Sequence, residues 1–130
     1  GNSGNLENNA GDITFSGVTA TSSNILGFAM DLDNDALYIH KDGTYMNSGN
    51  PTSGSSKTGA IDLSGGEAGF VFPAYGDSDT GASPSASYNF GNPPYSESGG
   101  NSDADGHGNF NQSVPSGYFA LCSKNLSEYG

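Results

Sequence analysis

Alternating apolar and polar residues in residues 25–47 constrain the fold of this 130-residue chain more than any other feature. In residues 25–32 every second side chain is large and apolar, and the alternation resumes in residues 36–41. A repeat of two residues is typical of a half-buried β-strand and does not fit a helix. The Asp42–Gly43 pair accepts the positive φ angles of a tight hairpin turn, and residues 44–47 supply a third short strand. The pattern therefore predicts a three-stranded antiparallel meander.

The positions of the turns also predict the register of this meander. With residues 34–35 as a two-residue turn, Met30 faces Ile39, and the Asp–Gly turn places His40 opposite Tyr45. A slip of one residue would scatter the large apolar side chains over both faces, so we expect this register to hold. The predicted core face carries Leu26, Phe28, Met30, Leu32, Leu37, Ile39 and Met46.

The rest of the chain predicts further short strands and long polar loops. No segment of ten or more residues has helical periodicity, so we expect an all-β fold, an antiparallel β-sandwich in a single domain. Its parts would be an irregular lead-in (residues 1–24), a core (25–122) and an exit segment (123–130), cut from a longer polypeptide. Additional strands are predicted at residues 13–18, 70–75, 85–90 and 117–121.

Composition and charge exclude several classes of function. The chain has 14 acidic residues against three lysines, a formal net charge of −11. Nucleic-acid binding needs clustered cationic side chains, so we expect no nucleic-acid partner. No apolar run approaches the roughly 18–20 residues that span a bilayer, so we expect no membrane insertion. Cys122 is the single cysteine, which excludes an internal disulfide.

The acidic residues raise the question of a bound cation. Asp31, Asp33 and Asp35 have the spacing that opens a calcium-binding EF-hand loop, but the sixth position is Ala36 and a strand follows. We therefore favour an ordinary Asp/Asn turn, with a cation site as the alternative. No cofactor is expected, and the alternative is weak Ca²⁺ binding by loop aspartates. These loop aspartates are Asp77, Asp79, Asp103 and Asp105.

Catalysis finds little support in the sequence. No Gly-x-Ser-x-Gly nucleophile turn stands between a strand and a helix. The acidic residues lie in predicted turns and loops or near strand ends, and the two histidines have no cysteine near them to complete a zinc site. We expect a protein that is not an enzyme.

Loop aromatics interleaved with amides suggest a binding site instead. Such rings stack on sugar rings while asparagine side chains hydrogen-bond to sugar hydroxyls. The alternative is that the rings pack the loop of residues 91–113 onto the sandwich. Loops longer than about 12–15 residues are usually functional or disordered. The candidate ligand-binding residues are Tyr75, Asp77, Asp79, Asn92, Tyr95, His107, Asn109 and Phe110.

Four sequence elements, in order, resemble the SPRY domain. Residues 25–34 (ILGFAMDLDN) and 41–43 (KDG) are similar to its "I-G-x-A-x-D-L-D-N-G" and "K-N-G" motifs. Residues 71–74 (VFPA) and 88–91 (YNFG) resemble its "F-P-A" strand and "N-F-G" ending. The resemblance implies a concanavalin-A-like jelly roll used for binding. It covers the C-terminal half of the family pattern, so the sandwich is expected to be incomplete, or completed by the lead-in, a neighbouring segment or another chain.

The resemblance also suggests where the protein works. Similarity to SPRY modules of bacteriophage structural proteins extends over residues 89–94, the Gly/Asn/Asp-rich loop after them, and residues 117–122 and 124–126. It implies a non-catalytic virion module, in a tail fibre, baseplate or capsid decoration, that is a homo-oligomer within a larger assembly. Its partners would be a host surface glycan or another virion protein, contacted through loops 48–59, 76–84 and 91–113. The alternatives are an assembly protein whose sheet edges and loops interlock copies, and a module that recognises short peptides.

Overall fold

The computed structural model describes residues 6–8, 11–13, 20–64 and 85–129 of the chain. The strand predicted at residues 70–75 and the loop 76–84 lie outside these residues, together with Tyr75, Asp77 and Asp79. All but the first residue of the strand predicted at 13–18 also lies outside them.

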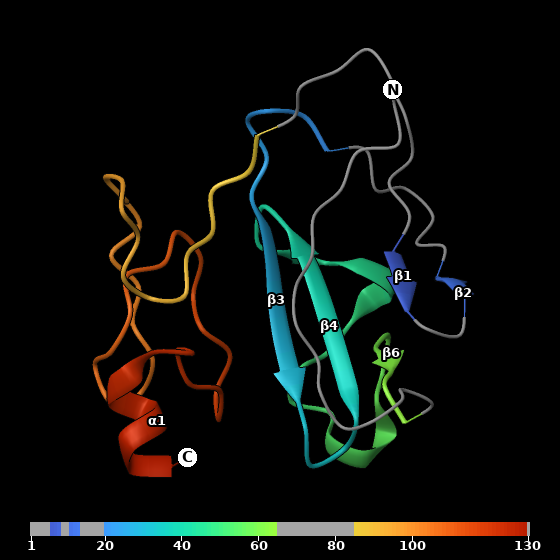
Figure 1. Cartoon of the computed structure of the whole chain (residues 1–130). Helices are drawn as coiled ribbons and strands as arrows, with labels where there is room; N and C mark the ends of the chain where they lie inside the picture. The colour runs from blue at the N-terminus through green and yellow to red at the C-terminus, as the bar shows by residue number, and fades with distance from the viewer. Residues whose placement is uncertain (1–5, 9–10, 14–19, 65–84, 130) are drawn as a thin grey trace.

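The sheet predicted from the alternating residues is present, and β4 (Ala36–Lys41) is at its centre. Along one edge β4 pairs with β3 (Leu26–Asp31) over the full length of both strands. Along its other edge it pairs with β5 (Thr44–Tyr45) and with β6 (Ile61–Asp62). All of these pairings are antiparallel (Figure 1). The predicted meander is therefore confirmed, although its third strand ends at Tyr45 and residues 46–48 form a 3-10 turn, and β6 adds a fourth strand.

The remaining elements are short. A hairpin of β1 (Leu6–Asn8) and β2 (Gly11–Ile13) lies in the lead-in, where irregular chain was predicted. The described helices are α1 (Ser123–Tyr129) and two 3-10 turns, η1 (Met46–Ser48) and η2 (Gly54–Ser56). The regular structure is thus mainly antiparallel strand with little helix, in agreement with an all-β class.

The register between β3 and β4 differs from the predicted one by two residues. Met30 pairs with Leu37, because the turn contains four residues, 32–35, rather than two. Asp31 closes this turn by accepting hydrogen bonds from the backbone N–H of Asn34 at 3.1 Å and from its side-chain amide at 2.9 Å. Because side chains alternate between faces, a shift of two residues leaves every side chain on its predicted face.

The turn between β4 and β5 has the predicted form. Asp42 and Gly43 have φ angles of +50° and +85°, and His40 lies opposite Tyr45. The Asp42 carboxylate accepts the backbone N–H of Ile25 at 2.8 Å, and this hydrogen bond is the main reason that the pKa of Asp42 is lowered. The turn is thereby joined to the start of β3.

Both faces of the sheet carry an apolar cluster, although one buried face was predicted. On the predicted face, Ile39 and Ile61 are buried. On the opposite face, Ala29, Ala36 and Tyr38 are buried, and Tyr38 is 1% exposed. The partly buried neighbours are Leu37, Met46 and Leu63 on the first face, and Tyr45, Ala60 and Tyr118 on the second.

Three of the predicted core residues are in fact exposed. Leu26, Phe28 and Leu32 have exposed fractions of 39%, 53% and 64%. The alternation identifies which side chains share a face, but it does not identify which face the rest of the chain covers. Here the small side chains of the opposite face, such as Ala29, allow close packing, which the size of the apolar side chains did not reveal.

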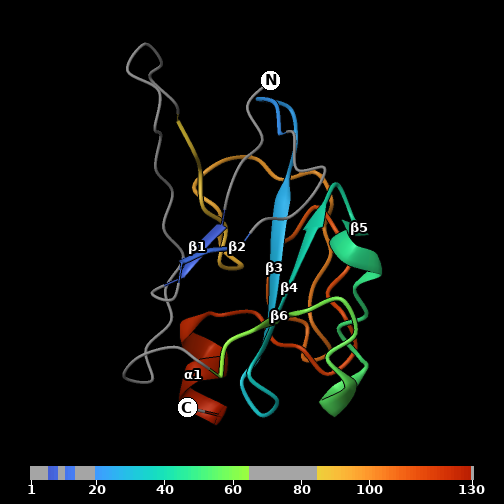
Figure 2. The same cartoon turned by 90° about the vertical axis from the view of Figure 1, so that its right-hand side faces the viewer.

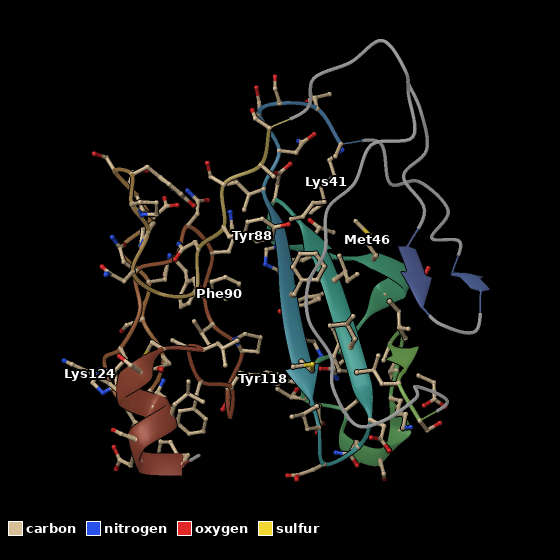
Figure 3. The ribbon with its side chains drawn as sticks, in the orientation of Figure 1. Lys41, Met46, Tyr88, Phe90, Tyr118 and Lys124 are labelled. Carbon is tan, nitrogen blue, oxygen red and sulfur yellow. The ribbon has the colours of Figure 1, made fainter. Side chains whose placement is uncertain are left out.

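A layer of mostly irregular chain, residues 85–129, lies along one side of the sheet in Figure 1 and behind it in Figure 2. Tyr118 joins this layer to the rest of the protein, because it packs against the cluster of Ala29, Ala36 and Tyr38 and donates its O–H to the Pro51 carbonyl at 2.8 Å. Figure 3 shows Tyr118 between the layer and the sheet, and Met46 on the other side.

Two strands predicted in this layer are absent from it. Residues 85–90 and 117–121 form no strand among the described residues. In the second segment Ala120 is buried, whereas Phe119 and Leu121 are 46% and 55% exposed. The apolar run at 117–121 resembles a buried strand, but Gly117 has a φ of +85° and the segment turns into α1.

Candidate functional site

A pocket of about 280 Å³ lies where the β4–β5 turn meets the C-terminal layer. His40 and Tyr45, which face each other across β4 and β5, line one wall, and Gly43 of the turn lies between them in the chain. Residues 112–115 of the layer line the other wall. We take this pocket as the candidate functional site, because it combines a wall on a sheet with a wall on a loop.

The His40 imidazole is held in one neutral form. It is 9% exposed, and its Nδ1 accepts the backbone N–H of Gly43 at 3.2 Å. The neutral ring therefore carries its proton on Nε2. Burial lowers the pKa of His40, while the nearby Asp42 carboxylate acts in the opposite direction. The ring packs edge-on against Tyr45, with 5.3 Å between ring centroids and 80° between planes.

Gly27 provides the space that the His40 ring occupies. The two residues pair across β3 and β4, and a Cβ atom added to Gly27 would lie 1.9 Å from Nε2 of His40. Any side chain at this position would therefore displace the imidazole. A glycine inside a strand lowers strand stability, and close approach of another group is a common reason for it.

Gln112 lies on the loop wall of the pocket, and its side chain is held by its neighbour Asn111. Its Nε2 donates to Oδ1 of Asn111 at 2.8 Å, and its Oε1 would lie 2.6 Å from a Cβ on Gly43. The glycine in the turn thus leaves room for the carboxamide. Ser113 beside it is exposed, and Val114 and Pro115 are half-buried.

The walls of the pocket are uncharged and of mixed polarity. Among the described residues that line it there is no Asp, Glu, Lys or Arg, although the chain as a whole carries a net charge of −11. Burial raises the pKa of Tyr45, so its phenol keeps its proton at neutral pH. The residues that line the pocket thus have imidazole, phenol, carboxamide and hydroxyl side chains, together with the apolar Val114 and Pro115.

The two described loop aromatics that were predicted to bind ligand have different surroundings. Phe110 is half-buried, and a Cβ on Gly108 would lie 2.4 Å from its ring, so the ring packs within the loop. Tyr95 is 40% exposed. Phe110 thus packs in the way that the alternative interpretation expected, and Tyr95 keeps a surface that faces solvent.

The candidate polar residues of this loop are placed mainly by backbone contacts. The carbonyl of Asn109 accepts the side-chain amide of Asn89 at 2.8 Å, and Asn92 is exposed. The backbone N–H of His107 donates to the Asp103 carboxylate at 2.8 Å. None of these predicted residues lines the pocket, nor do the two aromatics.

Asp103 organises the layer rather than an open binding surface. It is 6% exposed, and besides His107 its carboxylate accepts the backbone N–H groups of Ala120 at 2.9 Å and Asp105 at 3.1 Å. The side-chain amide of Asn125 donates to it at 2.7 Å. Burial raises the pKa of Asp103, but these hydrogen bonds outweigh it and bring the value to about 2. A cation at this carboxylate would have to displace the N–H donors.

The first aspartate series also has the geometry of a turn. Asp31 accepts two hydrogen bonds from Asn34, as described above, and Asp35 has a φ of +49°. The favoured interpretation of a turn is confirmed for this segment. Within the described part of the chain, no three His, Cys, Asp or Glu residues are grouped so as to hold a metal ion. The helices described here are too short or too polar to cross a membrane.

No family model, curated protein or solved structure matches the chain. The candidate site is therefore judged on its own residues and contacts.

Sequence reasoning identified part of this pocket but not its role. The predicted pairing of His40 with Tyr45 is confirmed, but the pocket beside the pair was not predicted. The pairing of Gly27 with His40 could not be read from the sequence, because the predicted register places His40 opposite Ala29. The contribution of residues 112–115 had no local signal, because it depends on how the layer packs on the sheet.

Proposed function

We propose that this chain is a non-catalytic, SPRY-like binding module of a bacteriophage virion protein, and that it contacts a host surface glycan. The resemblance of residues 25–34, 41–43, 71–74 and 88–91 to SPRY motifs supports the family and the virion role. The antiparallel sheet at residues 26–45 supports a β-sandwich of the concanavalin-A-like type. The single observation that carries the binding role is the uncharged pocket between the sheet and the C-terminal layer.

The size of the pocket suits one sugar ring. Its volume of about 280 Å³ is just below the roughly 300–1,000 Å³ of small-ligand sites. A ligand of about twelve non-hydrogen atoms, at about 0.3 kcal/mol each, binds with about 4 kcal/mol, which is a Kd on the order of 1 mM. Copies of the module on one particle would raise the apparent affinity by about 10²–10⁴. Adhesion of a whole virion therefore does not need a tight single site.

A glycan array tests this function. The full chain is displayed in many copies on a particle, because a single site with a millimolar Kd does not retain a monomer on the array. We expect retention on a subset of surface glycans. A blank array, together with no binding of the particles to host surface polysaccharide, would refute the glycan role.

A second candidate is an assembly protein, and one observation favours it. Among the described residues β3 pairs with β4 alone, and Leu26 and Phe28 of β3 are exposed. Such an edge can pair with a strand of another chain. Sedimentation of the isolated chain distinguishes the two roles. A folded monomer is expected for a self-contained module, and concentration-dependent association is expected for interlocking copies.

A further inference from the structure

We propose that the pocket formed by His40, Gly43, Tyr45 and residues 112–115 binds an uncharged pyranose and discriminates against acidic sugars. This inference rests on the proposed glycan-binding function and adds the chemical class of the sugar.

The first support is the charge of the walls. None of the described lining residues is Lys or Arg, so a sugar carboxylate would enter without a cationic partner. Removing a carboxylate from water without a partner is strongly unfavourable. The net charge of −11 adds a field that repels anions. A neutral ring has neither of these costs.

The second support is the kind of hydrogen-bonding groups present. Tyr45, Gln112 and Ser113 line the pocket, and side chains of these types include both donors and acceptors. Sugar hydroxyls are themselves donors and acceptors, so they match such groups without a change of protonation. Val114 and Pro115 add apolar surface on the loop wall, which suits the C–H groups of a pyranose ring.

The third support is the rigidity of the sheet wall. His40 is held by the Gly43 N–H at Nδ1, by the edge-on contact with Tyr45 and by its position against Gly27. The turn below it is tied to β3 through Asp42 and Ile25. A preformed wall lowers the entropy cost of binding, which matters most for a small and weak ligand.

A peptide ligand fits this pocket less well. An extended peptide is bound mainly by adding a strand to a sheet edge, and its side chains then enter alternate pockets. The candidate site is instead a single hollow beside a tight turn, with its polar groups on side chains. Recognition of a peptide is therefore an outcome of the test rather than the proposal.

The test compares matched serine variants in the multivalent full chain. Ser113→Ala removes a hydroxyl from the pocket, whereas Ser116→Ala removes an exposed hydroxyl from the same loop outside it. Gln112→Ala removes the carboxamide. The probes are neutral hexoses, a hexuronic acid and sialic acid, immobilised at equal density, and the readout is particle retention. Thermal unfolding of each variant confirms that it is folded.

We expect neutral sugars to be retained at least tenfold better than both acidic sugars. Ser113→Ala and Gln112→Ala should each lower this retention at least fivefold in the multivalent format, and Ser116→Ala should leave it unchanged. Preference for an acidic sugar, or full retention by the two pocket variants, would overturn the inference and leave the glycan-binding function standing. Retention of no sugar at all would overturn both. If a peptide from a virion protein displaces the particles from the sugars, and the two pocket variants weaken binding of that peptide, the pocket would be assigned to protein recognition instead.

Discussion

The contact between Gly27 and His40 predicts that Gly27→Ala destabilises the protein when His40 is present and does not when His40 is replaced by alanine. Gly27→Ala places a methyl group 1.9 Å from Nε2, 2.3 Å from Cε1 and 2.6 Å from Cδ2 of the imidazole. The ring is 9% exposed, so it has little room to move aside. Overpacking of this kind costs about 1–3 kcal/mol, and loss of the hydrogen bond from Gly43 adds about 1 kcal/mol.

An alanine in a strand has an opposing benefit. Relative to glycine it stabilises a strand by about 0.5–1 kcal/mol, because glycine loses more backbone freedom on folding. The expected net loss for Gly27→Ala is therefore about 1–3.5 kcal/mol. For a chain of this size about 4 °C of Tm corresponds to 1 kcal/mol, so the Tm should fall by about 4–14 °C.

Thermal unfolding followed by circular dichroism at pH 7 measures this loss. The His40→Ala background supplies the control, because it removes the ring that the methyl group strikes. In that background Gly27→Ala should be neutral or stabilising by up to about 1 kcal/mol. An equal loss of Tm in both backgrounds would refute the close contact between residues 27 and 40.

Three further predictions concern other contacts. The pKa of Asp103 is about 2, below its ordinary 3.8, so its contribution to stability is present above pH 3.8 and lost as the pH falls toward 2. In a series of Tm measurements at different pH values, Asp103→Ala should therefore lower the Tm at neutral pH and weaken the fall of Tm in acid. Burial lowers the pKa of His40, so the free energy of unfolding should fall as the pH drops below 6.5. In an NMR titration the imidazole signals should shift at a pH below that value, and an ordinary pKa would contradict the buried position. Tyr118→Phe removes the hydrogen bond to the Pro51 carbonyl and should cost about 1 kcal/mol in denaturant unfolding, whereas no change would show that water replaces this bond.

The part of the fold that the sequence predicted best is the part governed by local rules. Alternation identified β3 and β4, and the Asp42–Gly43 pair identified the turn with two positive φ angles. The register error of two residues came from Asp31, whose side chain closes a four-residue turn. Turn length depends on such side-chain hydrogen bonds, which periodicity does not report.

The parts that were missed depend on contacts between distant segments. The burial of Ala29 and the exposure of Phe28 follow from the layer that covers one face, not from the strand's own pattern. The same is true of Ala120, which was predicted to lie in a strand and is instead buried beside the Asp103 carboxylate. The pocket was missed for this reason too, because one of its walls belongs to the sheet and the other to the layer.

Because the two walls of the pocket come from distant segments of the chain, the pocket exists only in the folded protein. Residues 40–45 and 112–115 are far apart in the sequence, so the unfolded chain holds no version of the pocket. A bound sugar would therefore stabilise the native state alone, by about 1.4 kcal/mol when its concentration is ten times the Kd. Fragments that end before residue 112 should lose recognition entirely, even where the sheet itself still forms.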